Sequence, residues 1–242
     1  MPAGLEIIPH ISNAFTLSGK LPVMELFYTV QGEGFHSGTA AYFIRLAGCD
    51  VGCVWCDVKE SWQVEDSQYF TVTQIVEKAL EHPCRIAVIT GGEPCMYDLN
   101  SLIQLLHESG FRVHIETSGA YPLSGNPDWV CVSPKKFKSP LRDALEKADE
   151  IKVVVFNNSD FEWAEKNAAS VSMKCQLFLQ PEYDKSNRIL PVIVDYVKAN
   201  PKWRISLQTH KFIGIPWQTT SLKRLSYLFS CCFLWLLHSH SL

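Results

Sequence analysis

The sequence predicts an α/β fold in which parallel strands are covered by helices. Two observations predict it: short β-rich runs alternate with amphipathic helical runs, and polar or glycine residues follow the predicted strands. No internal repeat or low-complexity linker divides the 242 residues, which suffice to bury the core of one domain. We therefore expect a single domain over residues 1–216, followed by an apolar tail over residues 217–242.

The individual elements follow from the local residue pattern. The expected strands are short, β-rich and bounded by turn residues, and they are residues 41–48, 85–92, 112–119, 128–134, 150–156, 174–181 and 203–212. The expected helices have amphipathic spacing, and they are residues 71–82, 98–110, 140–148, 159–169 and 189–199. Thr71 or Thr73 is expected to cap the first helix, and Gly110 to close the second.

Polar or glycine residues mark six of the expected strand ends. These segments are GC at 48–49, TGGEP at 90–94, ETSG at 116–119, SPK at 133–135, QP at 180–181 and QTHK at 208–211. In parallel β/α barrels, the carboxyl ends of the strands form the rim on which sites are built. The six segments therefore predict one shared site.

Composition narrows the class of protein. Charged residues make up 19% of the chain and the formal net charge is −3, which gives no general electrostatic reason to expect nucleic-acid binding. The nine cysteines are odd in number and irregularly spaced, and the first residues lack the basic start and apolar run of a secretory signal. We expect a reducing, cytoplasmic setting in which cysteines bind metal or pack as small apolar residues.

The C-terminal tail contains an apolar run, Leu225–Leu237. This run is shorter than the roughly 18–20 residues that span a bilayer. No membrane association is therefore expected, but a membrane anchor, a docking helix and an appended segment of little role all stay open.

The segment GCDVGCVWCD places Cys49, Cys53 and Cys56 within eight positions. Three thiolates on a glycine-containing loop reach three corners of a [4Fe–4S] cubane and leave one iron open. A structural zinc site would need a fourth ligand, and the next cysteine, Cys84, lies beyond a predicted helix. A cluster is favoured over a zinc site with a distant ligand or unligated thiols.

The cysteine spacing, Trp55 before the last cysteine and the later GGEP resemble the radical S-adenosylmethionine enzymes. The resemblance implies a modified, shortened, partial parallel β/α barrel. It also implies that S-adenosylmethionine binds the open iron through its amino and carboxylate groups and yields a 5′-deoxyadenosyl radical. Gly91 and Gly92 would let backbone approach the methionine amino group, and the Glu93 carboxylate would accept a hydrogen bond from that group.

A closer resemblance, from about Glu25 to Pro216, is to the family of 7-carboxy-7-deazaguanine synthases. Its distinctive segments are FYTVQGEGFHSGTAAYFIRLAGC, CDVKESW, VITGGEPC, IETSG, VSPK, LQP and RISLQTHKFIGIP. The resemblance implies conversion of 6-carboxy-5,6,7,8-tetrahydropterin to 7-carboxy-7-deazaguanine with loss of ammonia, in 7-deazapurine (queuosine-type) biosynthesis. It also implies a homodimer and an external, flavodoxin-like electron donor.

The expected site residues divide by ligand. Arg45, among the apolar residues of a strand, is expected to pair with the substrate carboxylate. The other substrate contacts that the resemblance implies, or that stand at strand ends, are Val30, Gln31, Gly32, Thr90, Glu116, His210 and Pro216. The residues expected to bind S-adenosylmethionine are Trp55, Cys56, Asp57, Gly92, Glu93, Ser133, Lys135 and Gln180. The remaining cysteines are expected to pack or stay free, with Cys95 nearest the site.

Two features depart from the family pattern. Family members commonly carry Thr or Ser after CD, where its hydroxyl binds Mg²⁺, whereas this chain has Val58. We therefore expect no protein ligand for Mg²⁺ and a weakened or altered dependence on it. Pro216, near which the family often ends, is followed here by residues 217–242.

Two rival functions stay open on the sequence. A glycyl-radical activating enzyme shares the cysteine spacing but would take hydrogen from a protein glycine. A non-catalytic iron–sulfur or zinc protein would bind a partner through the apolar tail. The QGEG segment and Arg45 favour a small-molecule pocket over both.

Overall fold

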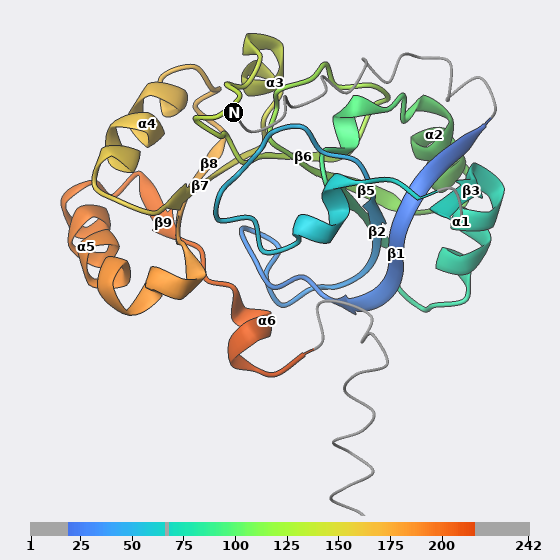
Figure 1. The fold of residues 1–242 in the computed structure, drawn as a ribbon, viewed down its shortest axis with the longest axis horizontal. Helices are drawn as coiled ribbons and strands as arrows, with labels where there is room; N and C mark the ends of the chain where they lie inside the picture. Colours follow the sequence, from blue (N-terminus) through green and yellow to red (C-terminus); the bar gives the residue numbers. More distant parts are fainter. Residues whose placement is uncertain (1–18, 66–67, 216–242) are drawn as a thin grey trace, which may run out of the picture.

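The computed structural model describes residues 19–65 and 68–215, and it shows a curved sheet with helices on its outer face (Figure 1). Nine strands follow the order β3-β1-β2-β4-β5-β6-β7-β8-β9. Their bounds are β1 Lys20–Val30, β2 Ala40–Leu46, β3 Tyr69–Thr71, β4 Ile86–Gly91, β5 Arg112–Thr117, β6 Trp129–Val132, β7 Glu150–Val155, β8 Gln176–Pro181 and β9 Trp203–Ile205.

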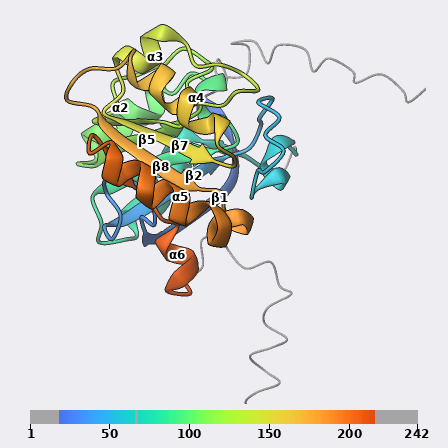
Figure 2. The same cartoon turned by 90° about the vertical axis from the view of Figure 1, so that its left-hand side faces the viewer.

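Helices α1 to α5 lie between successive strands and cover the convex face of the sheet, and α6 follows the last strand (Figures 1 and 2). They are α1 Val72–Leu80, α2 Asn100–Glu108, α3 Arg142–Glu146, α4 Ser159–Ala168, α5 Ser186–Ala199 and α6 Thr209–Phe212. Three short 3₁₀ segments, η2 Lys59–Trp62, η4 Pro94–Met96 and η5 Tyr183–Lys185, sit in the loops that follow β2, β4 and β8.

The sheet is a partial barrel, as expected. Strands β2 and β4 to β9 pair in parallel, each with the next in the order. The two ends of the order, β3 and β9, are not paired with each other, so the described part of the sheet stays open. The sequence did not predict β1, which pairs antiparallel with both β2 and β3 and widens the sheet at one edge.

Strand alternation separates the core from the site. On β2, Ile44 and Leu46 are buried in the main core under the helices, while Arg45 between them points to the opposite face. On β7, Ile151 and Val153 join the same core and Lys152 faces the inside of the curve. The inner face of the sheet can therefore carry polar and charged side chains while the outer face stays apolar.

Several expected element boundaries are confirmed and two are shifted. Thr71 caps α1 in a reciprocal capping box with Gln74, which stabilises the helix start by about 0.5–2 kcal/mol. Gly110, with φ of +81°, follows the end of α2. Helix α5 starts at Ser186, upstream of the expected start at residue 189, and contains Pro191. The last expected strand ends at Ile205 and turns into α6.

No helix in the described ranges is both long and apolar enough to cross a membrane. The expected tail, residues 217–242, lies outside the described residues.

Candidate functional site

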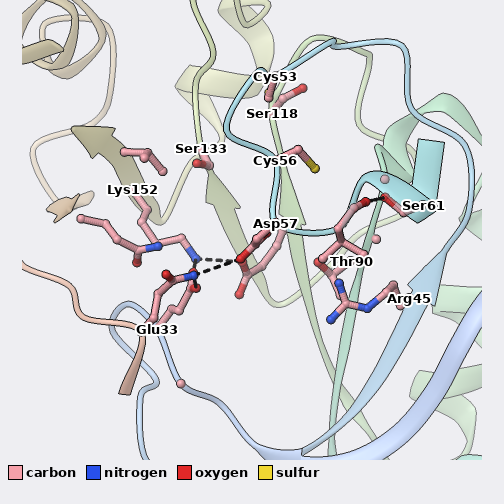
Figure 3. A pocket seen from close by; sticks show the side chains of 18 of the residues that line it. Glu33, Arg45, Cys53, Cys56, Asp57, Ser61, Thr90, Ser118, Ser133 and Lys152 are labelled. Atoms are coloured by element: carbon pink, nitrogen blue, oxygen red, sulfur yellow. Dashed lines mark hydrogen bonds and ion pairs between the residues drawn. The ribbon is translucent and has the colours of Figure 1, made fainter. Parts of the chain in front are cut away.

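One pocket, of about 280 Å³, opens on the concave face at the carboxyl ends of the parallel strands. It gathers the expected site residues from five strands, from the loops that follow β1, β2, β4 and β6, and from α6 (Figure 3). Those that line it are Val30, Gln31, Gly32, Arg45, Cys49, Cys53, Trp55, Cys56, Asp57, Thr90, Gly92, Glu93, Glu116, Ser133, Lys135, Gln180 and His210. Pro216, the remaining expected residue, lies outside the described residues.

The cysteine loop leaves β2 through Ala47 and Gly48 and is held by backbone contacts to η2. The Gly48 N–H donates to the Ser61 carbonyl at 2.7 Å, and the Cys49 N–H donates to the Trp62 carbonyl at 3.3 Å. Tyr97 donates its hydroxyl to the Ala47 carbonyl at 2.9 Å. The three free thiols of this loop are half-buried and face one pocket.

The donor set of this loop fits a cluster better than a single ion. Within residues 19–65 and 68–215, no three Cys, His, Asp or Glu side chains surround a point that one metal ion could fill. A cubane spreads its thiolate ligands over separate irons, so it does not need three side chains around one point. Burial raises the pKa of Cys49 to about 12, and cluster binding would therefore displace its proton.

Gly91 and Gly92 pack closely against the end of β2 and the start of the cysteine loop. A Cβ on Gly91, whose φ is +135°, would lie 2.1 Å from the Leu46 carbonyl oxygen, and one on Gly92 would lie 2.2 Å from the Gly48 carbonyl oxygen. The Gly92 N–H donates to Leu46 and the Glu93 N–H to Gly48, both at 2.9 Å. The two glycines allow β4 to pack backbone against backbone on the loop, a role that the sequence interpretation did not assign to them.

Glu93 is 1% exposed and both its carboxylate oxygens are occupied. Oε1 accepts from the Cys95 N–H at 3.0 Å and the Thr117 hydroxyl at 2.5 Å. Oε2 accepts from the N–H and the hydroxyl of Ser118. Four donors from the ends of β4 and β5 thus use the acceptor capacity of Glu93, which ties these two strand ends together.

Polar residues on the opposite wall come from β6 and β8. The Lys135 ammonium donates to the Ser133 hydroxyl at 2.6 Å. The Ser206 hydroxyl donates to Gln180 Oε1 at 2.7 Å, which leaves the amide nitrogen of Gln180 to face the pocket. Trp55 stacks on Phe156, with ring centroids 5.3 Å apart, and forms an aromatic side of the same wall.

Asp57 lines the pocket, and its side chain is 47% exposed (Figure 3). Its Oδ2 accepts from Gln208 Nε2 at 3.3 Å and from Lys211 Nζ at 3.4 Å. This carboxylate therefore connects the end of the cysteine loop with α6 and the residue before it.

Arg45 lies on β2 with Glu25 opposite it on β1. Arg45 Nε is 3.1 Å from Glu25 Oε2, and the guanidinium carbon is 5.6 Å from the Phe27 ring centroid. Thr90 is the register partner of Arg45 on β4. A guanidinium that lines a pocket on a fixed strand, held on one side by a carboxylate, suits a ligand carboxylate.

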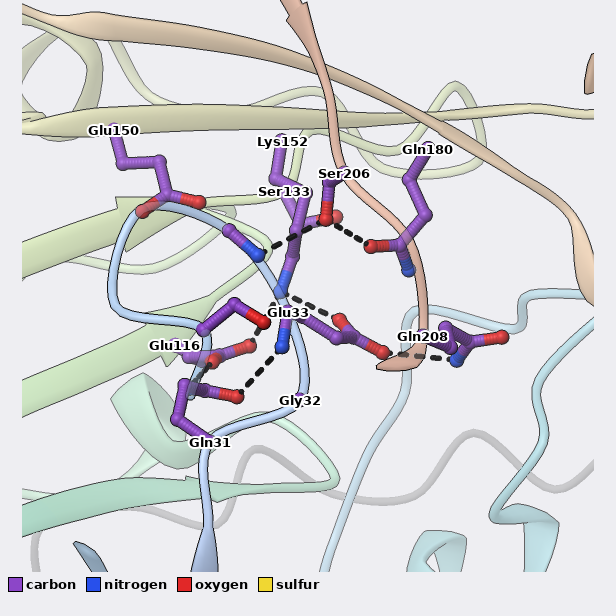
Figure 4. A network of polar contacts seen from close by, with 12 residues as sticks. Gln31, Gly32, Glu33, Glu116, Ser133, Glu150, Lys152, Gln180, Ser206 and Gln208 are labelled. Carbon is purple, nitrogen blue, oxygen red and sulfur yellow. Dashed lines mark hydrogen bonds and ion pairs between the residues drawn. The ribbon is translucent and has the colours of Figure 1, made fainter. Parts of the chain in front are cut away.

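Lys152 lies at the centre of a buried polar network that sequence reasoning missed (Figure 4). Its ammonium donates to Glu33 Oε2 at 2.7 Å and to Glu116 Oε2 at 2.8 Å. Gln31 Nε2 donates to Glu116 Oε1 and Gln208 Nε2 donates to Glu33 Oε1, each at 2.8 Å. The lysine inside the apolar run EIKVVVF could have indicated this network, since a buried ammonium needs paired carboxylates.

His210 is buried against the loop that follows β1. A Cβ on Gly32 would lie 2.1 Å from His210 Nδ1, so only glycine leaves room for the ring. The Thr209 N–H and hydroxyl both donate to the Gly32 carbonyl, each at 2.9 Å. Burial lowers the pKa of His210, although the Glu33 carboxylate opposes this shift.

Val58 is 4% exposed and offers no side-chain oxygen at the pocket wall. The nearby Ser61 hydroxyl donates to the Val58 carbonyl at 2.7 Å. The one hydroxyl next to this position along the loop is therefore engaged with backbone.

Cys84, Cys95, Cys131 and Cys175 are buried and free, as packing cysteines. Cys95 lies within η4, two residues after Glu93, and does not line the pocket. Cys231 and Cys232 lie outside the described residues.

Comparison with known proteins agrees with this geometry. Residues 43–154 match the model of the radical SAM superfamily. A 7-carboxy-7-deazaguanine synthase of Flavobacterium psychrophilum is 55% identical over 86% of this chain and 98% of its own length. One from Synechocystis is 44% identical over 85% of this chain and 97% of its own length. The crystal structure of QueE from Escherichia coli superposes with a TM-score of 0.72 and 34% identity, over 83% of this chain and 100% of that one.

Proposed function

The chain belongs to the 7-carboxy-7-deazaguanine synthase family of the radical S-adenosylmethionine superfamily, and from this premise we propose that it converts 6-carboxy-5,6,7,8-tetrahydropterin to 7-carboxy-7-deazaguanine. The observation that carries the proposal is a single pocket that combines three cysteines, a buried arginine and a network of carboxylates and amides. Substrate and product differ by one molecule of ammonia, so the overall conversion needs no net oxidant.

Membership of the superfamily implies a [4Fe–4S] cluster and S-adenosylmethionine. We propose Cys49, Cys53 and Cys56 as the cluster ligands, because these free thiols share one loop and one pocket. When bound, the cluster supplies the electron that cleaves S-adenosylmethionine and so provides a radical that removes hydrogen from the substrate. The protein binds and orients the reactants and limits the access of water.

For S-adenosylmethionine we propose the wall that carries Ser133, Lys135, Gln180 and Trp55, with the backbone of Gly92 beside the cluster loop. Lys135 offers a positive charge, Gln180 an oriented amide and Trp55 an aromatic face. Glu93 stays a proposed contact because it lines the pocket, and its carboxylate also accepts from four protein donors. Asp57 stays a proposed contact as well.

For the substrate we propose that Arg45 binds the carboxylate, at the end of the pocket next to Thr90. Gln31, Gly32 with Val30, Glu116 and His210 would contact the pterin ring. The buried positions of Arg45 and Gln31 support this arrangement, since hydrogen bonds to charged groups gain strength where water is excluded. Pro216 stays a proposed contact, although it lies outside the described residues.

Three further features are proposals. We propose that Mg²⁺ has no side-chain ligand at position 58, since Val58 carries no oxygen there. We propose a homodimer and an external electron donor of the flavodoxin type, on the family resemblance. Light scattering of the purified protein tests the first of these two, and turnover with a purified flavodoxin tests the second.

The reaction is tested anaerobically with cluster-loaded protein, a reductant, S-adenosylmethionine and 6-carboxy-5,6,7,8-tetrahydropterin. The expected product, detected by mass spectrometry, is 7-carboxy-7-deazaguanine with release of ammonia. If the protein forms only methionine and 5′-deoxyadenosine, the cluster chemistry stands and the substrate assignment is wrong.

A further inference from the structure

Lys152 is a buried cation to which the proposed reaction assigns no function. Its side chain is 4% exposed and its ammonium lies within 2.8 Å of two carboxylates, Glu33 and Glu116. The three side chains come from β7, the loop after β1 and β5, and all line the pocket. A buried ammonium costs several kcal/mol in desolvation unless it is paired, and here two carboxylates pair it.

The contacts around Lys152 close into a ring (Figure 4). Lys152 donates to Glu116, Glu116 accepts from the Gln31 amide nitrogen at 2.8 Å, and the Gln31 amide oxygen accepts from the Glu33 N–H at 3.1 Å. The Glu33 carboxylate returns to Lys152 at 2.7 Å. The ring fixes both the rotamer and the sense of the Gln31 amide, so that side chain is oriented before any ligand arrives.

The charged side chains of this ring give this part of the pocket a net negative charge. Two carboxylates and one ammonium sum to one negative charge. Of the other titratable groups packed against them, the Cys131 thiol has its pKa raised well above the usual value by burial, and His210 has its pKa lowered by burial. Glu150, two residues earlier on β7, has its pKa raised by burial and accepts from the Phe35 N–H at 3.1 Å.

We propose that Lys152 is a positioning residue for the substrate: it keeps the Glu33 and Glu116 carboxylates ionised and fixed, so that Glu116 and Gln31 accept from and donate to the pyrimidine edge of the pterin. This inference rests on the proposed function. The amino group and ring N–H of a pterin are donors, and an ionised carboxylate binds such donors more strongly than a neutral acid does.

Without the Lys152 ammonium, two carboxylates that now lie on either side of it would repel each other, and the pKa of the pair would rise. One of them would hold a proton near neutral pH, and a protonated Glu116 would donate where it must accept. Substrate binding would then improve as pH rises and the proton is lost, whereas the native protein has no such dependence in this range.

The experiment compares Lys152→Met, Lys152→Arg and the surface control Lys198→Met, all as cluster-loaded protein, between pH 6.5 and 8.5. The native and Lys198→Met proteins are expected to show a flat KM for the pterin. Lys152→Met is expected to raise KM by about tenfold or more at pH 6.5. At pH 8.5 the increase in KM is expected to be several-fold smaller. Lys152→Arg keeps the charge and is expected to keep the flat profile, with KM within a few-fold of native.

Cleavage of S-adenosylmethionine without substrate provides a readout of folding and cluster loading, and it is expected to stay near native in all variants. A KM for Lys152→Met that is native and flat with pH overturns the proposal. Equal, pH-independent losses in Lys152→Met and Lys152→Arg also overturn it, because they indicate a packing role. Native turnover is measured first, so a wrong reaction assignment appears there and not in the variants.

If Lys152→Met does not fold, the double variant Glu33→Gln/Lys152→Met carries the same test. This double variant keeps the net charge of the ring at one negative charge, and it removes the like charge next to Glu116. Its expected KM is flat with pH and within about tenfold of native. Loss of product at every pH, with cleavage of S-adenosylmethionine retained, would mean that the ammonium itself contacts the substrate and would overturn the positioning role.

Discussion

Arg45 and Glu25 are register partners across the antiparallel strands β2 and β1, with Arg45 Nε 3.1 Å from Glu25 Oε2 and both side chains about nine-tenths buried. Glu25, on the neighbouring strand, holds the Arg45 guanidinium at the pocket wall. Such a pair can accept a second carboxylate from a ligand without a new cation, since a guanidinium offers five donors.

The first prediction concerns this pair. Arg45→Ala is expected to weaken substrate binding by about 2–3 kcal/mol, since hydrogen bonds to charged groups are worth about that much. Cleavage of S-adenosylmethionine without substrate should persist. Isothermal titration of the pterin into cluster-loaded protein measures the effect, and Glu25→Gln, which keeps the guanidinium, is the control. Unchanged affinity in the Arg45 variant would remove this residue from the substrate site.

The second prediction concerns the cluster. Cys53→Ala is expected to prevent assembly of a complete [4Fe–4S] cluster, since one of three proposed thiolate ligands is lost. Cys84→Ala, which removes a buried cysteine outside the pocket, is expected to load iron and sulfide like the native protein. Iron and sulfide content and visible absorbance after anaerobic reconstitution measure both. A Cys53 variant with native cluster content would contradict the ligand assignment.

Much of this architecture could be predicted from the sequence, because its signals are local. The alternation of β-rich and amphipathic runs predicted the parallel strands, and Thr71, one of two expected caps, caps the first helix. The antiparallel strand β1 was missed because its sequence was interpreted through the QGEG motif and not through strand alternation. Expected site residues converge on one pocket because they stand at the carboxyl ends of parallel strands.

What could not be predicted depends on contacts between distant segments. Lys152 stands out only as a charge in an apolar strand, and nothing local says that Glu33 and Glu116 reach it. The GGEP segment shows the same limit. Its glutamate was expected to contact S-adenosylmethionine, and Glu93 does line the pocket. Its carboxylate also accepts from donors at the end of β5 and in η4, and local spacing does not reveal these contacts.

The third prediction concerns Gly32. Gly32→Ala is expected to destabilise the loop and α6 by about 1–3 kcal/mol and to raise the substrate KM, because the new methyl group would lie 2.1 Å from His210 Nδ1. In the His210→Ala background the same change should cost much less, since the ring is gone. Urea unfolding of the four proteins measures the coupling. Equal costs in both backgrounds would rule out the steric cause.

The fourth prediction concerns Val58. Turnover of the native protein is expected to change little between Mg²⁺-free buffer and buffer with Mg²⁺, because the buried Val58 side chain has no oxygen ligand. Val58→Thr adds a hydroxyl in nearly the same volume and is expected to introduce stimulation by Mg²⁺. Strong Mg²⁺ dependence of the native protein would mean that water and substrate alone hold the ion.

The last prediction concerns stability and His114, which lies on the inner face of β5 below the pocket. Burial, with the nearby His36 ring and the Arg112 charge, lowers the pKa of His114 from 6.5 to about 4. The unfolded chain therefore binds more protons than the folded chain between these values, so stability is present at pH 7 and is lost as pH falls. Between pH 7.5 and pH 5 the loss attributable to this residue is about 2 kcal/mol.

His114→Phe keeps a ring among His36 and Trp129 but cannot be protonated. It should reduce the fall in unfolding free energy between pH 7.5 and pH 5, as measured by urea unfolding under anaerobic conditions. His82→Gln, which replaces a half-buried histidine stacked on Tyr28, serves as the matched control. Because burial disfavours only the charged imidazole, an unchanged pH slope in His114→Phe would mean that the folded chain accepts this proton without cost.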